Sequence, residues 1–118
     1  MWQKKQKLCV LKNCILELLV LGLICEKATY GYELMARLKE RSGGSFVLKE
    51  GTLYPILYRL EDDGMIGSAW SQGEGKNLPK KMYHATQAGQ QELLRRLSIW
   101  FDFSGTVNSF FQGGSQHE

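Results

Sequence analysis

The chain has 118 residues, the length of a single domain. Its hydrophobic share of 43% and charged share of 23% are those of an ordinary globular protein, which excludes a disordered or fibrous chain. The formal net charge of +3 permits an anionic partner without requiring one. The positions of the charges therefore matter more than their sum.

Metal, cofactor and membrane functions find little support in the sequence. The cysteines Cys9, Cys14 and Cys25 lack C-x-x-C spacing, and no cluster of His and Cys completes a zinc tetrad. We expect them to be small hydrophobic residues in a reducing cytosol, the alternative being a thiol sensor or a metal ligand. The longest apolar stretch, 15–25, is too short to span a bilayer and contains Glu17. We expect a cytoplasmic protein without a cofactor.

Three helices are predicted in the first half of the chain. Apolar residues near i, i+3, i+4 and i+7 spacing predict the first over residues 4–26. Thr29 is a candidate N-cap for the second, which Gly43 and Gly44 end. The stretch "KEGTLYPILYRLEDDG", residues 49–64, predicts the third.

The periodicity changes after residue 64. Two short strands, 65–70 and 80–85, are separated by a loop with Gly, Asn and Pro, which predicts a long hairpin. Thr86 is expected to cap a last helix that ends or bends at Ser104 and Gly105. The link between the second and third helices leaves room for an extra strand at 46–48. The fold class is mainly α with a small β-hairpin.

The third helix has two different faces. At about 100° per residue, an apolar stripe forms its buried side: Leu53, Ile56, Leu57 and Leu60. The remaining surface carries hydroxyl, phenol and guanidinium groups that can bond phosphates and base edges in a major groove: Thr52, Tyr54, Tyr58 and Arg59. The alternative is structural, with Tyr54 packed against the hairpin and Tyr58 covering a surface seam.

Helices two and three, joined through a connection that contains glycine, fit a helix-turn-helix, and the hairpin beside them fits a wing. Lysines occur where such a unit would meet flanking phosphates: Lys4, Lys5, Lys49, Lys76, Lys80 and Lys81. For any one of them, a solvated surface position is the simpler interpretation. As a set, they favour double-stranded DNA as the partner.

These residues resemble the PadR family of bacterial transcriptional regulators in its short-chain, multidrug-regulator-like form. The matching pieces, in order, are "YGYEL" at 30–34, "EGTLYPILYRLEDDGMI" at 50–66, "GSAW" at 67–70 and "KKMYHATQAGQQEL" at 80–93. The resemblance implies a winged helix-turn-helix, a homodimer joined through the first and last helices, repression of a neighbouring operon, and major-groove contact by the third helix. The wing carries lysines where many members carry arginines, so arginine-specific wing contacts are not expected.

The last helix carries more apolar side chains than a chain of this size can cover alone, which favours burial against a second subunit. The expected dimer residues are Leu11, Ile15, Leu93, Leu97, Trp100 and Phe101. The resemblance to multidrug-binding members places a tryptophan at Trp100, facing its mate across the dimer axis. A pair of indoles can sandwich a flat ligand, so an aromatic effector is expected around Leu93, Leu97 and Trp100. The alternative is a plain hydrophobic seam.

The predicted protein is therefore a homodimeric repressor relieved by a small hydrophobic or aromatic effector. Its expected organisation is a winged helix-turn-helix domain over 1–85, a dimerisation helix over 86–111, and a disordered tail over 112–118. The alternative function is a winged-helix module that binds protein and not DNA. Catalysis is not expected, because the two histidines, His84 and His117, accompany no visible nucleophile and no phosphate-binding loop.

Overall fold

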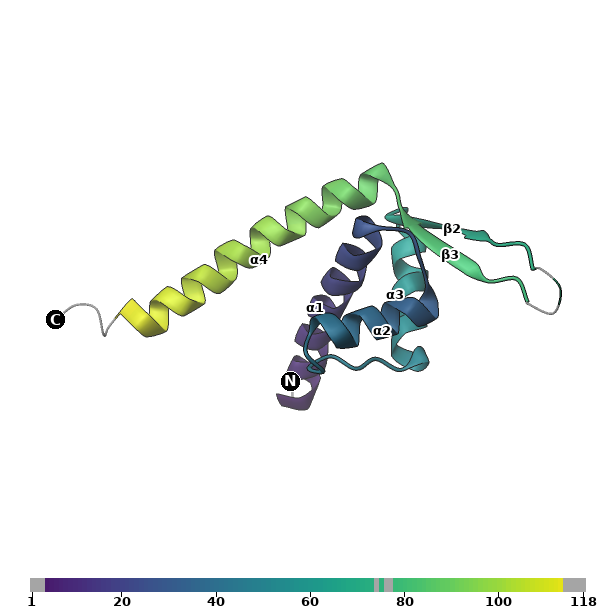
Figure 1. Cartoon of the computed structure of the whole chain (residues 1–118). Coiled ribbons are helices and arrows are strands. Elements are labelled where there is room, and N and C mark those ends of the chain that lie inside the picture. The colour runs from purple at the N-terminus through teal and green to yellow at the C-terminus, as the bar shows by residue number, and fades with distance from the viewer. Residues whose placement is uncertain (1–3, 74, 76–77, 114–118) are drawn as a thin grey trace.

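The computed structural model describes residues 4–73, 75 and 78–113, and the side chains of the first helix from Cys14 onward. The predicted order of helix, helix, helix, hairpin and helix is confirmed, with one short strand added (Figure 1). The elements are α1 Lys4–Glu26, β1 Thr29–Tyr30, α2 Gly31–Arg41, α3 Glu50–Asp62, β2 Ile66–Trp70, β3 Lys81–Ala85 and α4 Gln87–Gly113.

The core forms around α1 and α3. Each residue of the predicted α3 stripe is at most 2% exposed, as the helical wheel requires: Leu53, Ile56, Leu57 and Leu60. They belong to one apolar cluster with buried residues of α1: Leu16, Val20, Leu21, Leu23 and Ile24. Burying a side chain of this size contributes about 1.5–3 kcal/mol, so the stripe fixes which side of α3 faces outward.

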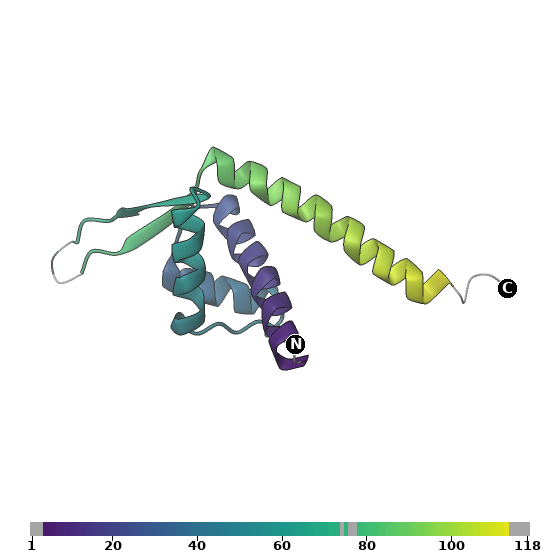
Figure 2. The ribbon, with the colours of Figure 1, turned by 180° about the vertical axis from the view of Figure 1, so that it is seen from behind.

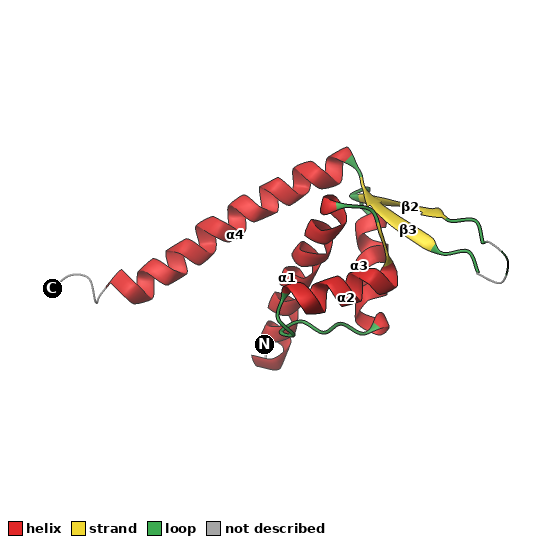
Figure 3. Ribbon diagram, viewed as in Figure 1, coloured by secondary structure: helices red, strands yellow, loops and turns green. Residues whose placement is uncertain are grey.

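The sheet has three antiparallel strands in the order β1-β3-β2, at the end of the body away from the free end of α4 (Figure 3). Ser68 pairs with Tyr83 in the hairpin, and Thr29 pairs with Tyr83 on its other side. The third strand is thus β1. The expected strand at 46–48 is wrong, because that segment links α2 to α3, with the Phe46 N–H bonded to Ser42 Oγ and Leu48 buried.

The start of α2 differs from the prediction. Thr29 is not its N-cap but a fully buried residue of β1, and Tyr30 occupies the cap position before Gly31. The Glu33 carboxylate accepts the Tyr30 N–H at 3.0 Å and the Thr29 hydroxyl at 3.2 Å. These bonds, the backbone one foremost, hold the pKa of Glu33 below its usual value. α2 ends as predicted, with positive φ at Gly43 and Gly44.

Helix α4 begins as predicted and ends later. Thr86 caps it, with Oγ1 accepting the Gly89 N–H at 3.0 Å. The expected end or bend at Ser104 and Gly105 is wrong: the helix continues to Gly113 and projects away from the body (Figure 2). The residues of the expected tail from 114 onward lie outside the described part. Among residues 4–73, 75 and 78–113, no helix is both long and apolar enough to cross a bilayer.

Candidate nucleic-acid interface

The outward side of α3 is open to solvent. Thr52 is exposed, and Tyr58 is 72% exposed on the side opposite the buried stripe. The first turn is accessible too, since a Cβ built on Gly51 would meet nothing within 4 Å. Nothing in the described subunit therefore covers the end and face of α3 that would approach a groove.

Tyr54 contacts α2 and is only partly available. A Cβ built on Gly31 would lie 2.7 Å from the Tyr54 hydroxyl, so the phenol rests on the first residue of α2. Tyr54 as a whole is nevertheless 42% exposed. Tyr54 also lies near Tyr83, whose pKa is raised by burial first and by Tyr54 and Glu61 after it. Tyr54 thus sets the approach of α2 to α3 while it remains partly exposed to solvent.

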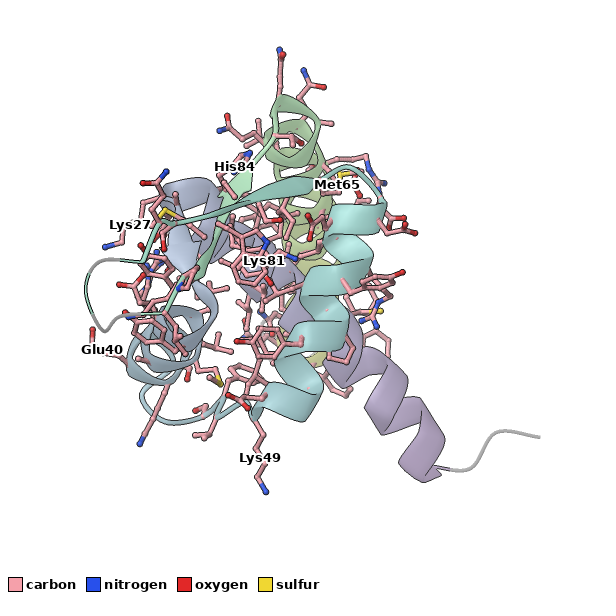
Figure 4. All side chains as sticks on the ribbon, turned by 90° about the vertical axis from the view of Figure 1, so that its right-hand side faces the viewer. Lys27, Glu40, Lys49, Met65, Lys81 and His84 are labelled. Carbon is pink, nitrogen blue, oxygen red and sulfur yellow. The ribbon has the colours of Figure 1, made fainter. Side chains whose placement is uncertain are left out.

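Lys49 marks the amino end of α3. Its carbonyl accepts the N–H groups of Thr52 and Leu53, both at 3.0 Å, which starts the helix. Its side chain is exposed and points away from the body at the end of α3 (Figure 4). An ammonium in this position can reach a phosphate without any rearrangement of the fold.

Arg59 does not stand free on the outward face. Its Nε lies 3.4 Å from Oε2 of Glu17 on α1, and its side chain is 50% exposed. The helical wheel placed Arg59 outside the buried stripe of α3, and α1 supplies a carboxylate beside it. Contact with DNA therefore requires Arg59 to use its other donors or to leave Glu17.

The wing lysines are held by aromatic rings and by one carboxylate. Lys81 Nζ lies 3.5 Å from Glu61 of α3 and 5.5 Å from the centre of the Tyr83 ring. Hydrogen bonding from Ser68, and then the charge of Lys81, lower the pKa of Glu61. Figure 4 shows Lys81 between the hairpin and α3. Lys76 lies outside the described residues, and so do the side chains of Lys4 and Lys5, which belong to α1.

Sequence reasoning missed an aromatic cluster beside the wing. Tyr30 and Tyr32 stack with ring centres 5.8 Å apart, and Lys80 Nζ lies 5.2 Å from the centre of the Tyr32 ring. Trp70, at the end of β2, is also largely exposed. The two tyrosines on either side of Gly31 are a signal in the sequence for an aromatic cluster at the start of α2. Their stacking depends on β1, however, and the sequence patterns do not predict that strand.

The expected effector residues line one groove. A cavity of about 770 Å³ between α1, α2 and α4 is bordered by Ile15, Leu93, Leu97, Trp100 and Phe101, together with Leu38 and Phe46. Leu93 and Leu97 are half-buried, whereas Phe101 is largely exposed. The structure thus brings together all the predicted effector residues and the predicted dimer residues except Leu11, whose side chain lies outside the described part.

The chain is similar to proteins of known family. Residues 20–95 match the transcriptional regulator PadR-like family. The negative transcriptional regulator PadR of Bacillus subtilis is 35% identical over 79 residues, 67% of this chain and 43% of that protein. The chain thus spans less than half the length of that relative.

Solved structures agree with this family match. A PadR family transcriptional regulator from Eggerthella lenta gives a TM-score of 0.76 at 27% identity, covering 92% of this chain and 91% of its own. Bacillus subtilis PadR in complex with operator DNA gives 0.63 at 35% identity, covering 70% of this chain and 46% of its own. With α2 and α3 forming the helix-turn-helix and β2 and β3 forming the wing, the chain belongs to the PadR-like family of transcriptional regulators.

Proposed function

We propose that this regulator is a cytoplasmic homodimer that represses transcription by inserting α3 into the major groove of an operator. In the proposal, Thr52, Tyr54 and Tyr58 contact bases or phosphates, while lysines at the start of α3 and in the wing contact flanking phosphates. The observation that carries the proposal is the free polar face of α3 opposite a fully buried stripe. A relative named as a negative regulator, and solved with operator DNA, supports it.

An electrophoretic shift with the DNA upstream of its own gene, repeated over a range of salt concentrations, tests the proposal. Binding should weaken steeply as salt rises, because phosphate contacts release counterions. Lys49→Gln should reduce the salt slope by about 1, and Tyr58→Ala should cost about 1–3 kcal/mol of binding. Lys39→Gln, at the far end of α2, is the charge-matched control. A folded protein that binds no DNA would favour the protein-binding module.

The dimer proposal rests on α4. From Ile99 onward, α4 projects away from the body of the subunit and exposes seven large apolar side chains: Ile99, Trp100, Phe101, Phe103, Val107, Phe110 and Phe111. Contiguous apolar surface of this kind is rare on a monomer and is covered economically by a second copy. We propose that two chains pair along α1 and α4.

The effector proposal rests on the groove beside Trp100. Its walls are mainly apolar, and the Trp100 indole is 37% exposed, so a flat aromatic molecule can stack there. Titration of the DNA-free protein with acridine orange, followed by dye fluorescence, tests this. Trp100→Ala should weaken dye binding about tenfold or more, whereas Trp70→Ala, which removes an exposed indole from β2, should not. Equal affinity for wild type and Trp100→Ala would exclude the site.

A further inference from the structure

One carboxylate of α1 joins the helix that faces DNA to the helix that carries Trp100. α1 lies between α3 and α4 (Figure 2). Glu17 accepts Arg59 Nε of α3 on Oε2 at 3.4 Å, and Arg96 Nη1 of α4 on Oε1 at 2.8 Å. Its side chain is only 20% exposed, so these ion pairs are screened less than surface pairs are.

The two bonds to Glu17 are unequal. The Arg59 contact is long for a charge-assisted hydrogen bond, while the Arg96 contact has the usual length of a strong one. Arg59 donates only its Nε–H to Glu17, and within the described residues neither of its Nη groups has a hydrogen bond. A guanidinium so loosely held is free to bind a phosphate or a guanine edge.

Arg96 is held from two sides. Its Nε donates to Glu92 at 2.6 Å, one turn earlier on α4, while Nη1 donates to Glu17. Partial burial acts to lower the pKa of Arg96, but its hydrogen bonds to Glu92 and Glu17 outweigh this and raise it. The position of α4 therefore determines how much of the Glu17 charge remains for Arg59.

The same charges border a second groove beside Trp100. A cavity of about 550 Å³ is lined by Glu17, Arg59 and Arg96, and by Ile99, Trp100 and Phe103. A ligand or a subunit that shifts α4 near Trp100 therefore acts next to the Glu17 contacts. No other described ion pair joins α3 to α1, or α4 to α1.

We infer that Glu17 is a positioning residue through which α4 controls the recognition helix. While Arg96 holds Glu17, Arg59 stays weakly held and available to DNA. When α4 shifts and draws Arg96 away, Glu17 pairs fully with Arg59 and withdraws it from DNA. This regulation rests on the proposed function, and it adds Arg59 to the residues that are proposed to bind operator DNA.

Operator affinities of matched variants test the inference. Glu17→Gln should tighten binding about three- to tenfold, because it frees Arg59, and Arg96→Gln should weaken it by a similar factor. Both effects should disappear in an Arg59→Gln background. Loss of folding does not tighten binding, so the opposite signs distinguish positioning from simple destabilisation.

The controls are Glu26→Gln and Arg41→Gln, which break a 2.8 Å ion pair between α1 and α2 and change net charge by the same amounts. The inference would be overturned if Glu17→Gln and Arg96→Gln changed operator affinity as much in the Arg59→Gln background as in the wild type. It would also be overturned if their effects were no larger than those of the controls. If Glu17→Gln does not fold, Arg96→Gln with and without Arg59→Gln measures the same coupling. A wild type that binds no DNA overturns the proposed function and this inference with it, whereas normal binding without coupling overturns the inference alone.

Discussion

Gly89 lies so close to Met65 that a Cβ on Gly89 would overlap the Met65 carbonyl oxygen. The same oxygen accepts the Thr86 N–H at 3.1 Å and the Thr86 hydroxyl at 3.0 Å. Met65 immediately precedes β2, so this contact fastens the first turn of α4 to the base of the wing. The contact between Gly89 and Met65 therefore helps to set the direction in which α4 leaves the body.

Replacing Gly89 by alanine should therefore displace α4. The new Cβ would meet the backbone of Met65, which cannot swing aside as a side chain can, so we expect a loss of about 1–3 kcal/mol in the free energy of unfolding. Urea denaturation measures it. Gly105→Ala is the control, because a Cβ there meets nothing within 4 Å, and it should stabilise the helix by about 0.5–1 kcal/mol. Equal effects at both positions would contradict this account of Gly89.

The contact between Gly31 and Tyr54 predicts a coupled pair. Gly31→Ala should push the Tyr54 ring outward, since the new Cβ would lie 2.7 Å from its hydroxyl and 3.2 Å from Cζ. Tyr54→Phe removes the nearer clash. The double variant should therefore be about 0.5–1 kcal/mol more stable than the sum of the two single effects predicts. Thermal unfolding of the four proteins gives the cycle. Strict additivity would show that the two side chains do not touch.

Glu92 predicts a loss of stability in acid. Hydrogen bonds from Arg95, and then from Arg96, lower the pKa of Glu92 from 4.5 to about 2. Its contribution is therefore complete above about pH 4.5 and is lost as the pH falls towards 2. Because Arg95 is largely exposed, we expect Glu92 to contribute only about 1 kcal/mol to the free energy of unfolding.

Unfolding free energies of Glu92→Gln and wild type between pH 7 and pH 2.5 measure this contribution. The variant should be less stable at neutral pH, and the difference should shrink in acid. Some acid sensitivity should remain, because the pKa values of Glu26, Glu33 and Glu61 are lowered too. A constant difference across the range would rule out the Glu92 ion pairs as its source.

The exposed apolar side of α4 predicts a charge-sensitive dimer. Phe101→Glu places a carboxylate on a side chain that is 64% exposed in the single chain but expected to be buried between two. Light scattering should find a monomer at concentrations where the wild type is a dimer. Gln91→Glu, at an exposed polar position on the same helix, should leave the dimer intact. A dimeric Phe101→Glu protein would place the interface elsewhere.

Local patterns were sufficient for most of the fold. The α3 stripe and the Thr86 cap depend on residues within a few positions of each other, which helical periodicity and capping rules describe. The two-residue strand β1 is too short for any pattern, and a Thr just before a helix has the local signature of a cap. Ser104 and Gly105 have the composition of a break, but one solvent-exposed glycine costs only about 1 kcal/mol and does not end a long helix.

The interface was harder to predict because it depends on distant residues. The exposure of Thr52 and Tyr58 follows from the helical wheel alone. The pairing of Arg59 with Glu17 joins positions 42 residues apart, and the Lys80 contacts join the wing to the start of α2. No local rule gives either arrangement, since both depend on how whole elements pack.

The uninterrupted course of α4 also bears on the operator. A continuous helix has little freedom to bend at its middle. Two chains paired along α4 would therefore hold their two recognition helices at a fixed separation. Operator affinity should therefore fall less on substitution of one base pair than on insertion of one. If the operator consists of two symmetric halves, inserting a single base pair between them would rotate one half relative to the other, and two chains paired along a straight α4 could not follow that rotation.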